Sequence, residues 1–485
     1  MQDRPGASLR EYLNTPVDAA SFAAFRFLFG VLMSVAMLRF LAKGWVRELL
    51  VAPSFHFTYP GFAFVKPGPL LAMQSLYVVL ALLALAIAVG LFQRFAAIAF
   101  FAGFTYIELI DQALYLNHYY LVSLLAALLA LLPFGRFHSL RSLHALRRPE
   151  RRVVQIPRWM LLVMRLQVGV VYFFAGVAKL NRDWLVDAQP LRIWLPARAD
   201  LPLVGWLLEY PATAHAASWL GALFDLSIVF LLLSRRTRRP AFAAVVLFHL
   251  FTALLFPIGI FPWLMTCAAT LFLSPDWPRR WFGRFGRRPD PQDAQDAQAA
   301  QDTGVATDAY QPPRWLGYLL VLHCLAQVAL PLRQLFQAQP SAWTLSGFNF
   351  AWNVMVAEKS GHVTFRRRDR SSGEVEIIEP RRFLARFQEL AMAQDPALVQ
   401  QAALYLAAES RASGHDVAVY ADAIASLNGR RAQPLIDPSA DLTAELPSRF
   451  VVPLRQAGAT SKRYVVERAD SRFPNSSAKD ESDVN

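Results

Sequence analysis

The feature that most constrains this chain is a series of long apolar segments separated by short polar connectors. The candidates for membrane-spanning helices lie at residues 18–40, 70–92, 94–111, 118–134, 158–180, 214–234, 240–258, 260–274 and 315–335. A helix needs about 20 apolar residues to cross a bilayer, so we expect the shorter segments to be tilted or only partly inserted. A composition that is 55% hydrophobic and 18% charged is typical of the same class. The sequence therefore predicts an α-helical multi-pass membrane domain of about nine transmembrane helices.

The places where the apolar character stops suggest the domain boundaries. We expect a polytopic membrane domain over 1–280, a flexible linker over 281–313, a final transmembrane helix over 314–335, a small α+β domain over 336–455 and a disordered tail over 456–485. The linker is of low complexity and contains many Gln, Asp and Pro residues, a composition that cannot bury a core. The tail is polar, which favours disorder for the same reason.

The α+β character of the last domain is indicated by short periodic segments. Apolar alternation bounded by turn residues predicts strands, and apolar spacing of three to four residues predicts helices. The expected elements are a hairpin made of HVTFRRRDR and EVEIIEP (362–380), helices over 380–393 and 396–412, and a strand over 417–427. Pro396 is well placed for the first turn of the second helix.

Arginines mark one side of the predicted bundle. They cluster in the connectors after the fourth, sixth and eighth apolar segments, which simple alternation places on the same side. Arginine-rich connectors face the cytoplasm. We therefore expect a multi-pass plasma (inner) membrane protein with a cytoplasmic N-terminus and an extracytoplasmic α+β domain. We interpret the formal net charge of +13 as a topology signal and expect no nucleic-acid partner.

One lysine, Lys179, ends the apolar stretch VVYFFAGVAKLNRDWL (170–185). A lysine in this position often extends its ammonium to the membrane surface. The small residues Ala175, Gly176 and Ala178 favour a different environment, because they let neighbouring helices approach closely. A lysine buried in that way can act as a base. Both interpretations remain open at this point.

Other polar groups are expected at the same end of the bundle. From Arg158, about 21 residues of helix span roughly 30 Å, so Lys179 lies at the outer end of its helix. The preceding segments bring Glu108, Asp111, Asn117 and His118 to that end. Interfacial polar residues are common, so His118 alone could be an anchor. Together these groups predict a site with a base, an acid and an imidazole.

The cysteines predict neither a disulfide framework nor a metal site. The chain has two, Cys267 and Cys324, and both lie in apolar segments. No CxxC or Cys/His spacing of the kind that binds zinc is present. We therefore expect no metal among the cofactors.

A series of motifs resembles those of the vitamin K-dependent γ-glutamyl carboxylases and their bacterial relatives, which have an HTTM-type membrane domain. The motifs are FRFLFGVLM (25–33), YLNHYYLVSLLA (115–126), VVYFFAGVAKLNRDW (170–184), FHLFTALLFPIGIF (248–261), SPDWPRR (274–280), AWNVMV (351–356), HVTFRRRDRSSGE (362–374) and AIASLNGRRAQPLIDP (423–438). They occur in the order of the family, and the resemblance extends from about Pro16 to Arg455.

The resemblance implies an enzyme of the lyase class that couples two reactions. A reduced naphthoquinone is converted to its epoxide with O2, and CO2 is added at the γ-carbon of a glutamate in a protein. The implied cofactor is vitamin K hydroquinone or menaquinol, with O2 and CO2 as co-substrates. The implied partners are a glutamate-containing protein or peptide, the membrane quinone and the lipid bilayer.

The resemblance also implies roles for individual residues. Lys179 matches the catalytic base, His118 with its neighbour Asn117 matches the active-site histidine, Phe261, Met265 and His249 match positions around the quinone, and Trp352 and Lys359 match positions that recognise the glutamate. Lys359 replaces an arginine of the family, and a lysine cannot form the bidentate hydrogen bonds with which a guanidinium binds a carboxylate.

The chain departs from the animal enzymes in several places. Ala178 replaces a lysine, Gln334 replaces a histidine, and the cysteine pair of the luminal domain is absent. Two alternatives therefore stay open. One is a quinol epoxidase-like membrane enzyme without protein carboxylation, and the other is a transporter or structural membrane protein.

Overall fold

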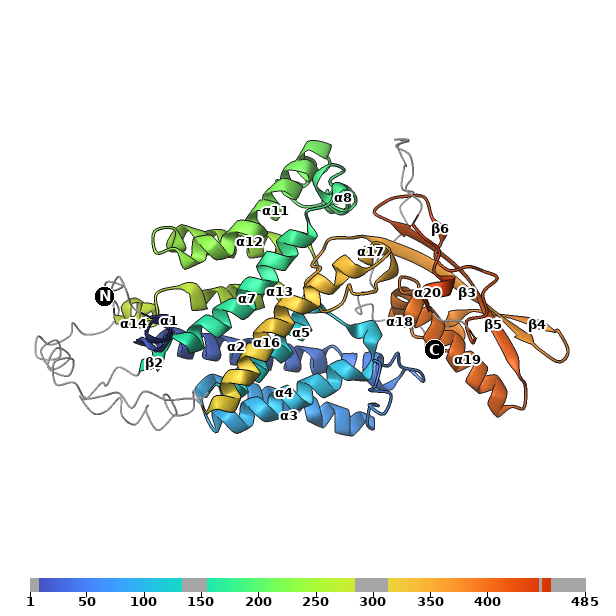
Figure 1. Cartoon of the computed structure of the whole chain (residues 1–485), viewed down its shortest axis with the longest axis horizontal. Coiled ribbons are helices and arrows are strands. Elements are labelled where there is room, and N and C mark those ends of the chain that lie inside the picture. The colour runs from blue at the N-terminus through green and yellow to red at the C-terminus, as the bar shows by residue number, and fades with distance from the viewer. Residues whose placement is uncertain (1–7, 133–154, 284–312, 445–446, 455–485) are drawn as a thin grey trace, which may run out of the picture.

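The computed structural model describes residues 8–132, 155–283, 313–444 and 447–454. Its helices form an elongated bundle, and a smaller domain with a β-sheet is attached to one end of the bundle (Figure 1). Most of the predicted linker, the predicted tail and most of the arginine-rich connector after the fourth apolar segment lie outside the described residues.

Every predicted apolar span is helical. The helices are α2 (Ala20–Ala42), α3 (Leu70–Val89), α4 (Gln93–Ile110), α5 (Asn117–Leu131), α7 (Arg158–Ala178), α11 (Pro211–Leu233), α12 (Arg238–Leu255), α13 (Phe261–Ala269) and α16 (Arg314–Leu332). Within the described part of the chain, 7 helices are long and apolar enough to cross a membrane, whereas Asn117–Leu131 and Phe261–Phe272 are shorter. The protein is therefore a mostly helical membrane protein, as the sequence predicts.

Shorter elements connect these helices. They are α1 (Leu9–Asn14), α8 (Arg182–Leu185), α9 (Leu191–Trp194), α10 (Gly205–Leu208), α14 (Trp277–Gly283), α17 (Ser341–Thr344), α20 (Pro447–Phe450), a π-helix (Val46–Val51) and five 3₁₀ turns (Gln112–Leu114, Pro196–Arg198, Thr270–Phe272, Arg333–Phe336, Pro380–Arg382). Far from the sheet domain, β1 (Pro16–Asp18) pairs with β2 (Gln155–Pro157) and joins two distant parts of the chain.

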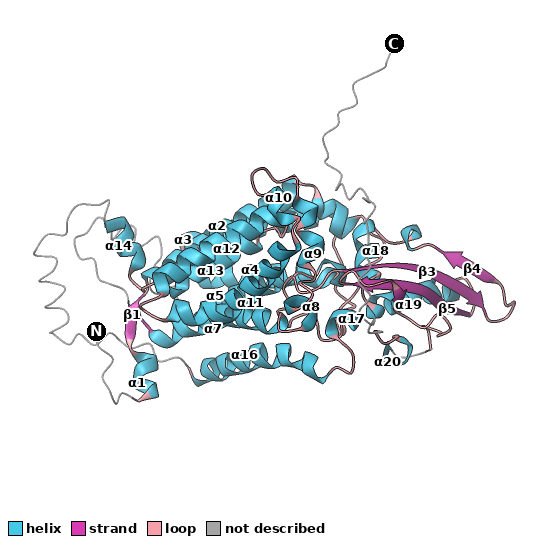
Figure 2. Ribbon diagram, turned by 90° about the horizontal axis from the view of Figure 1, so that it is seen from above, coloured by secondary structure: helices cyan, strands magenta, loops and turns pink. Residues whose placement is uncertain are grey.

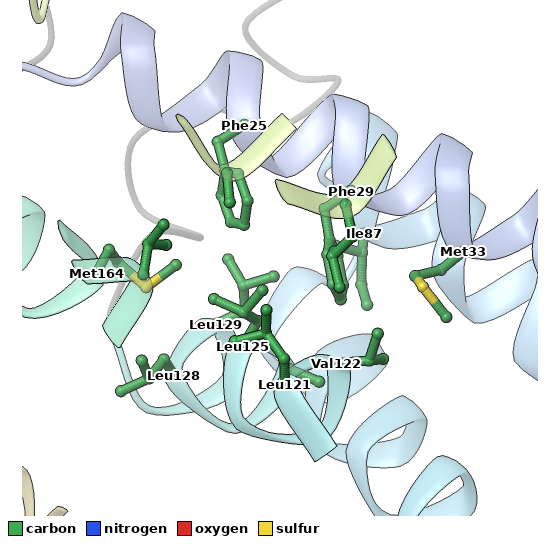
Figure 3. Packing of buried hydrophobic residues seen from close by; sticks show 14 of the residues in the cluster. Phe25, Phe29, Met33, Ile87, Leu121, Val122, Leu125, Leu128, Leu129 and Met164 are labelled. Carbon is green, nitrogen blue, oxygen red and sulfur yellow. The ribbon is translucent and has the colours of Figure 1, made fainter. Parts of the chain in front are cut away.

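The core of the bundle is built from large apolar side chains that meet between helices. Phe25 and Phe29 of α2 point toward Leu121 and Leu125 of α5, with Met164 of α7 beside them (Figure 3). All five side chains are buried. Since lipid tails are as apolar as these residues, close packing rather than the hydrophobic effect holds the helices together.

The C-terminal domain is an antiparallel sheet with helices packed against it. Its elements are β3 (Lys359–Asp369), β4 (Val375–Ile378), α18 (Arg386–Met392), α19 (Pro396–Ala412), β5 (Val417–Leu427) and β6 (Gln433–Pro434), and the strand order is β4-β3-β5-β6. The predicted hairpin, second helix and last strand are confirmed. The first predicted helix is shorter than expected, because a 3₁₀ turn occupies its first residues and α18 begins only at Arg386.

Two polar clamps attach this domain to the end of the bundle, where Figure 2 shows the sheet. On one side, the Asp183 carboxylate of α8 accepts hydrogen bonds from Arg430 Nη1 at 2.7 Å and from Asn428 Nδ2 at 2.6 Å. On the other side, Asp111 at the end of α4 accepts a bond of 2.7 Å from Gln388 of α18. These charge-assisted bonds join the two domains at both edges of the contact.

Candidate functional site

Lys179 is buried where the two domains meet. It is the C-cap of α7, and the residue is only 6% exposed. Its Nζ atom lies 2.8 Å from Oδ2 of Asp225, which is on α11 and is itself 5% exposed. The side chain is therefore engaged inside the protein and does not extend to the membrane surface.

Gly176 explains how the two charged residues come together. A Cβ atom added to this residue would lie 2.8 Å from Leu226 Cγ and 2.9 Å from Leu226 N, too close for any side chain. The absence of a side chain lets the backbone of α11 approach α7 one turn before Lys179. Asp225, next to Leu226, is thereby brought to the lysine, as the small residues of the stretch predict.

Two backbone carbonyls complete the surroundings of the Lys179 amino group. Nζ lies 3.1 Å from the oxygen of Ala175, one turn earlier in α7, and 3.4 Å from the oxygen of Val354 in the C-terminal domain. It also lies 5.1 Å from the centroid of the Trp184 ring. The lysine therefore has three oxygen acceptors from three separate segments.

The covering loop (residues 350–355) carries Val354 and lies over the end of the bundle. Its backbone conformation is strained. Phe350, Trp352 and Met355 all have positive φ angles, at 62°, 57° and 53°. Such angles are unfavourable for residues other than glycine and cluster at functional sites. The loop is held by its Asn353 carbonyl, which accepts a hydrogen bond of 3.0 Å from Asn117 Nδ2.

Trp352 is the residue of this loop that contacts the helices. Its ring stacks on that of Tyr120 in α5, with 5.1 Å between the centroids. The residue is 1% exposed, and its indole Nε1 has no hydrogen-bond partner among the described residues. A buried donor without a partner is costly, so this N–H is available to a bound group.

His118 lies near the start of α5, beside the loop before α13. A Cβ built on Gly259 would be 3.8 Å from His118 Nε2, so the backbone of that loop faces the imidazole. The ring of Phe261 lies 6.0 Å from the ring of His118 and also 6.0 Å from that of His249. Within the part of the chain that the structure describes, the His118 ring makes no hydrogen bond. The predicted quinone residues thus form one group around Phe261.

His249 is the more buried of the two histidines. Its Nε2 lies 2.8 Å from the hydroxyl of Tyr172 on α7, while its Nδ1 is buried and has no partner among the described residues. Met265, one turn after Phe261 on α13, is fully buried. The site therefore consists mostly of apolar side chains, with a few polar atoms that are available to hydrogen-bond a ligand. No three His, Cys, Asp or Glu side chains gather as metal ligands in the described ranges.

Lys359 lies in a different environment. At the start of β3, its ammonium donates to the carbonyls of Trp343 and Gln394, and the residue is 7% exposed. Burial lowers the pKa of Lys359 to about 7, although nearby Asp395 opposes this shift. Its contacts are inside the C-terminal domain, so of the two predicted glutamate-recognition residues only Trp352 reaches the helices.

A chain of polar side chains supports the site from inside the bundle. His323 Nε2 lies 2.8 Å from Gln167 Oε1, Gln167 bonds to Gln327 at 3.4 Å, and Gln327 donates to the Tyr120 hydroxyl at 3.0 Å. Hydrogen bonds of this kind join membrane helices, here α16 to α7 and α5. They fix the ring on which Trp352 stacks.

Asp225 is a site residue that was not predicted from the sequence, although a signal for it is present there. Asp225 is the only Asp or Glu in Pro211–Leu233, and an ionisable residue inside an apolar span indicates a functional site. Asp111 was expected at the same end of the bundle as Lys179. Its carboxylate accepts a hydrogen bond of 2.7 Å from Gln388 of the C-terminal domain and lies 3.2 Å from His56 Nδ1, and it does not bond to Lys179.

Comparison with known proteins gives two matches. The family model of the HTTM domain matches residues 14–277. The family model of the lumenal domain of vitamin K-dependent gamma-carboxylase matches residues 312–456. The second match includes the helix α16 of the bundle as well as the sheet domain. No solved structure matches the chain.

Proposed function

The chain belongs to the vitamin K-dependent γ-carboxylase family, and we propose that it couples epoxidation of a reduced naphthoquinone to carboxylation of glutamate in a protein. The observation that carries this proposal is the buried Lys179–Asp225 pair, beside an apolar group with unpartnered polar atoms. A buried lysine is suited to act as a base. In this assignment the C-terminal domain is extracytoplasmic, and the N-terminus is cytoplasmic, in the plasma membrane.

The residues around Phe261 fit a quinone. Phe261 and Met265 offer apolar surface for a fused ring system, and the imidazole rings of His118 and His249 each lie 6.0 Å from the ring of Phe261. Vitamin K hydroquinone or menaquinol, reacting with O2 and leaving as an epoxide, supplies the strong base that removes the γ-proton of glutamate before CO2 is added. Burial of the site excludes water, which would quench such a base.

Each polar residue has a separate task in this proposal. Lys179 Nζ takes the proton of the quinol hydroxyl, and His118 contacts the quinol oxygens. Asn117 holds the covering loop through Asn353 and is itself held by the Tyr115 hydroxyl, which donates to Asn117 Oδ1 at 3.0 Å. Trp352, with its free indole N–H, is placed to meet the glutamate as it arrives from the C-terminal domain.

A second candidate is a quinol epoxidase-like enzyme that does not carboxylate protein. One observation favours it: the Lys359 ammonium is taken up by two backbone carbonyls of its own domain. An ammonium engaged in this way is not free to bind a substrate carboxylate. In both candidate functions Lys179 deprotonates the quinol. They differ in whether the strong base that then forms from the quinol removes a proton from glutamate.

The decisive experiment measures both products with purified protein in detergent. Reduced vitamin K is supplied in air, and epoxide is followed together with incorporation of labelled CO2 into a glutamate-containing peptide. We expect both products from the natural protein. Epoxide without incorporation would select the second candidate, and absence of both would reject the two proposals.

A further inference from the structure

We propose that Asp225 is the proton store of Lys179: the carboxyl holds a proton at rest, so that Lys179 is kept as the free amine. This inference rests on the proposed role of Lys179 as a base and concerns a residue that lies behind it. Asp225 acts through the lysine and is a positioning residue.

The hydrogen-bond geometry allows the pair to exist without charges. An ammonium has three N–H donors, and an amine has two N–H donors and one lone pair. The carbonyls of Ala175 and Val354 can only accept, so they take the two N–H bonds of an amine. The third neighbour, Asp225 Oδ2 at 2.8 Å, is the one oxygen of the three that can carry a proton and donate it to the lone pair.

Burial favours the uncharged form of the Lys179–Asp225 pair over the ionic form. The side chains of Lys179 and Asp225 are each 7% exposed, and the neighbouring faces of α7 and α11 are apolar. Desolvation of two charges is unfavourable, and their mutual attraction offsets this free energy only when further hydrogen bonds satisfy both groups. Apart from Lys179, no described residue donates a hydrogen bond to the Asp225 carboxylate. The uncharged pair avoids this cost and still gives each hydrogen on Lys179 Nζ and on Asp225 Oδ2 an acceptor.

The same arrangement provides a place for the incoming proton. The Val354 carbonyl is the most distant of the three acceptors, at 3.4 Å, and belongs to the strained covering loop. When a quinol hydroxyl takes its place, rotation about Cε–Nζ turns the lone pair toward that hydroxyl. Lys179 Nζ then forms the new N–H bond, and the electron pair of the broken O–H bond stays on the quinol oxygen. The resulting ammonium is balanced by that oxygen, because Asp225 is already neutral.

Infrared spectroscopy tests the resting state without any turnover. Protein labelled with ¹³C at the aspartate carboxyls is compared with unlabelled protein at neutral pH, and the label shifts the C=O stretch of a protonated aspartic acid. We expect such a band in the natural protein. It should be absent from Asp225→Asn, retained in Lys179→Met, and retained in the matched control Asp200→Asn, whose carboxylate is exposed.

The opposite pattern would overturn the proposal. If the natural protein lacks the band and Lys179→Met gains it, the pair is ionic at rest and Asp225 stores no proton. If Asp225→Asn does not fold, the natural protein and Lys179→Met still decide. Because no quinone is added, the result is independent of whether the protein proves to be an epoxidase.

Chemical rescue with a small amine tests whether the Asp225 carboxyl is needed during turnover. A small amine such as methylamine should restore epoxidation to Lys179→Ala by at least about tenfold, since Asp225 can hold the added amine. The double variant Lys179→Ala/Asp225→Asn should not be rescued, whereas Lys179→Ala/Asp225→Glu should recover part of the activity. Equal rescue with and without the carboxyl would refute the proposal, because a merely structural carboxyl would not be needed by a free amine.

Discussion

Replacement of Gly176 by alanine should separate Lys179 from Asp225 without touching either residue. The added Cβ would lie 2.8–2.9 Å from Leu226 Cγ, Cδ2 and backbone N. Carbon contacts are most favourable at about 3.5–4.0 Å, so α11 has to move away by roughly 0.7 Å. A shift of this size lengthens the 2.8 Å Nζ–Oδ2 contact to about 3.5 Å, beyond the range of a hydrogen bond.

The expected cost has two parts of opposite sign. Overpacking of a tight interface destabilises by roughly 1–3 kcal/mol. Alanine in place of glycine stabilises a helix interior by up to about 1 kcal/mol. The net result is a moderate loss of stability, whereas a misplacement of about 1 Å at a reacting group can lower the rate on the order of 10²-fold. Gly176→Ala should therefore lose far more epoxidation than stability.

Two glycines serve as controls for this variant. Gly169 faces the same helix, but its added Cβ would meet only the ends of the Val229 side chain, at 3.2 and 3.8 Å. At Gly317 on α16 an added Cβ meets nothing within 4 Å. Thermal unfolding and epoxide formation are measured for all three alanine variants. If Gly176→Ala kept the activity of Gly169→Ala, the close approach of α7 and α11 would not be what positions Lys179.

Further predictions concern the base, the domain contact and the buried lysine of the sheet domain. Lys179→Arg should lower the rate of epoxidation by about 10²- to 10⁴-fold, because a guanidinium stays protonated. The variant should still insert into the membrane and bind quinone. Near-normal turnover would mean that Lys179 does not act as a base. Arg430→Ala should leave the Asp183 carboxylate with the hydrogen bond from Asn428 but without its ion-pair partner. Hydrogen exchange in the covering loop should increase while the bundle stays folded, and unchanged exchange would show that this clamp is not needed. For Lys359, the folded pKa of about 7 lies below the unfolded value of about 10.4, so the unfolded chain binds more protons between these values and stability rises with pH. Between pH 7 and pH 9 the free energy of unfolding should increase by about 2 kcal/mol relative to Lys359→Met, and equal slopes in denaturant titrations would contradict the burial of the amine.

Most of the fold could be predicted because it depends on local patterns. Length and apolarity identify the membrane helices, and two-residue alternation identifies β3 and β5. Pro396 does begin α19, as its fixed φ angle suggests. The start of α18 was predicted too early, since Pro380 begins a 3₁₀ turn and the chain leaves helical geometry at Phe383, where φ is −135°.

The candidate site could be predicted only in part because its contacts are long-range. The sequence identifies Lys179 as a residue to be explained, but its partner Asp225 is 46 positions away on a helix whose crossing point depends on packing at Gly176. Lys359 shows the reverse case. A motif match suggests a role in substrate recognition, whereas the direction of its side chain depends on the carbonyls of Trp343 and Gln394, which no local pattern reveals.

The site is complete only when both domains are in contact. Lys179 obtains one acceptor from its own helix, one from α11 and one from the covering loop of the C-terminal domain. The strain of that loop has to be offset by its contacts with the bundle, such as the bond between Asn117 and Asn353. Asp183, which binds the C-terminal domain, is four residues after Lys179 in the sequence, so we expect a displacement of the domain to move Lys179 as well. The burial of Lys179 therefore depends on correct docking of the C-terminal domain, to which the short segment between Lys179 and Asp183 is bound.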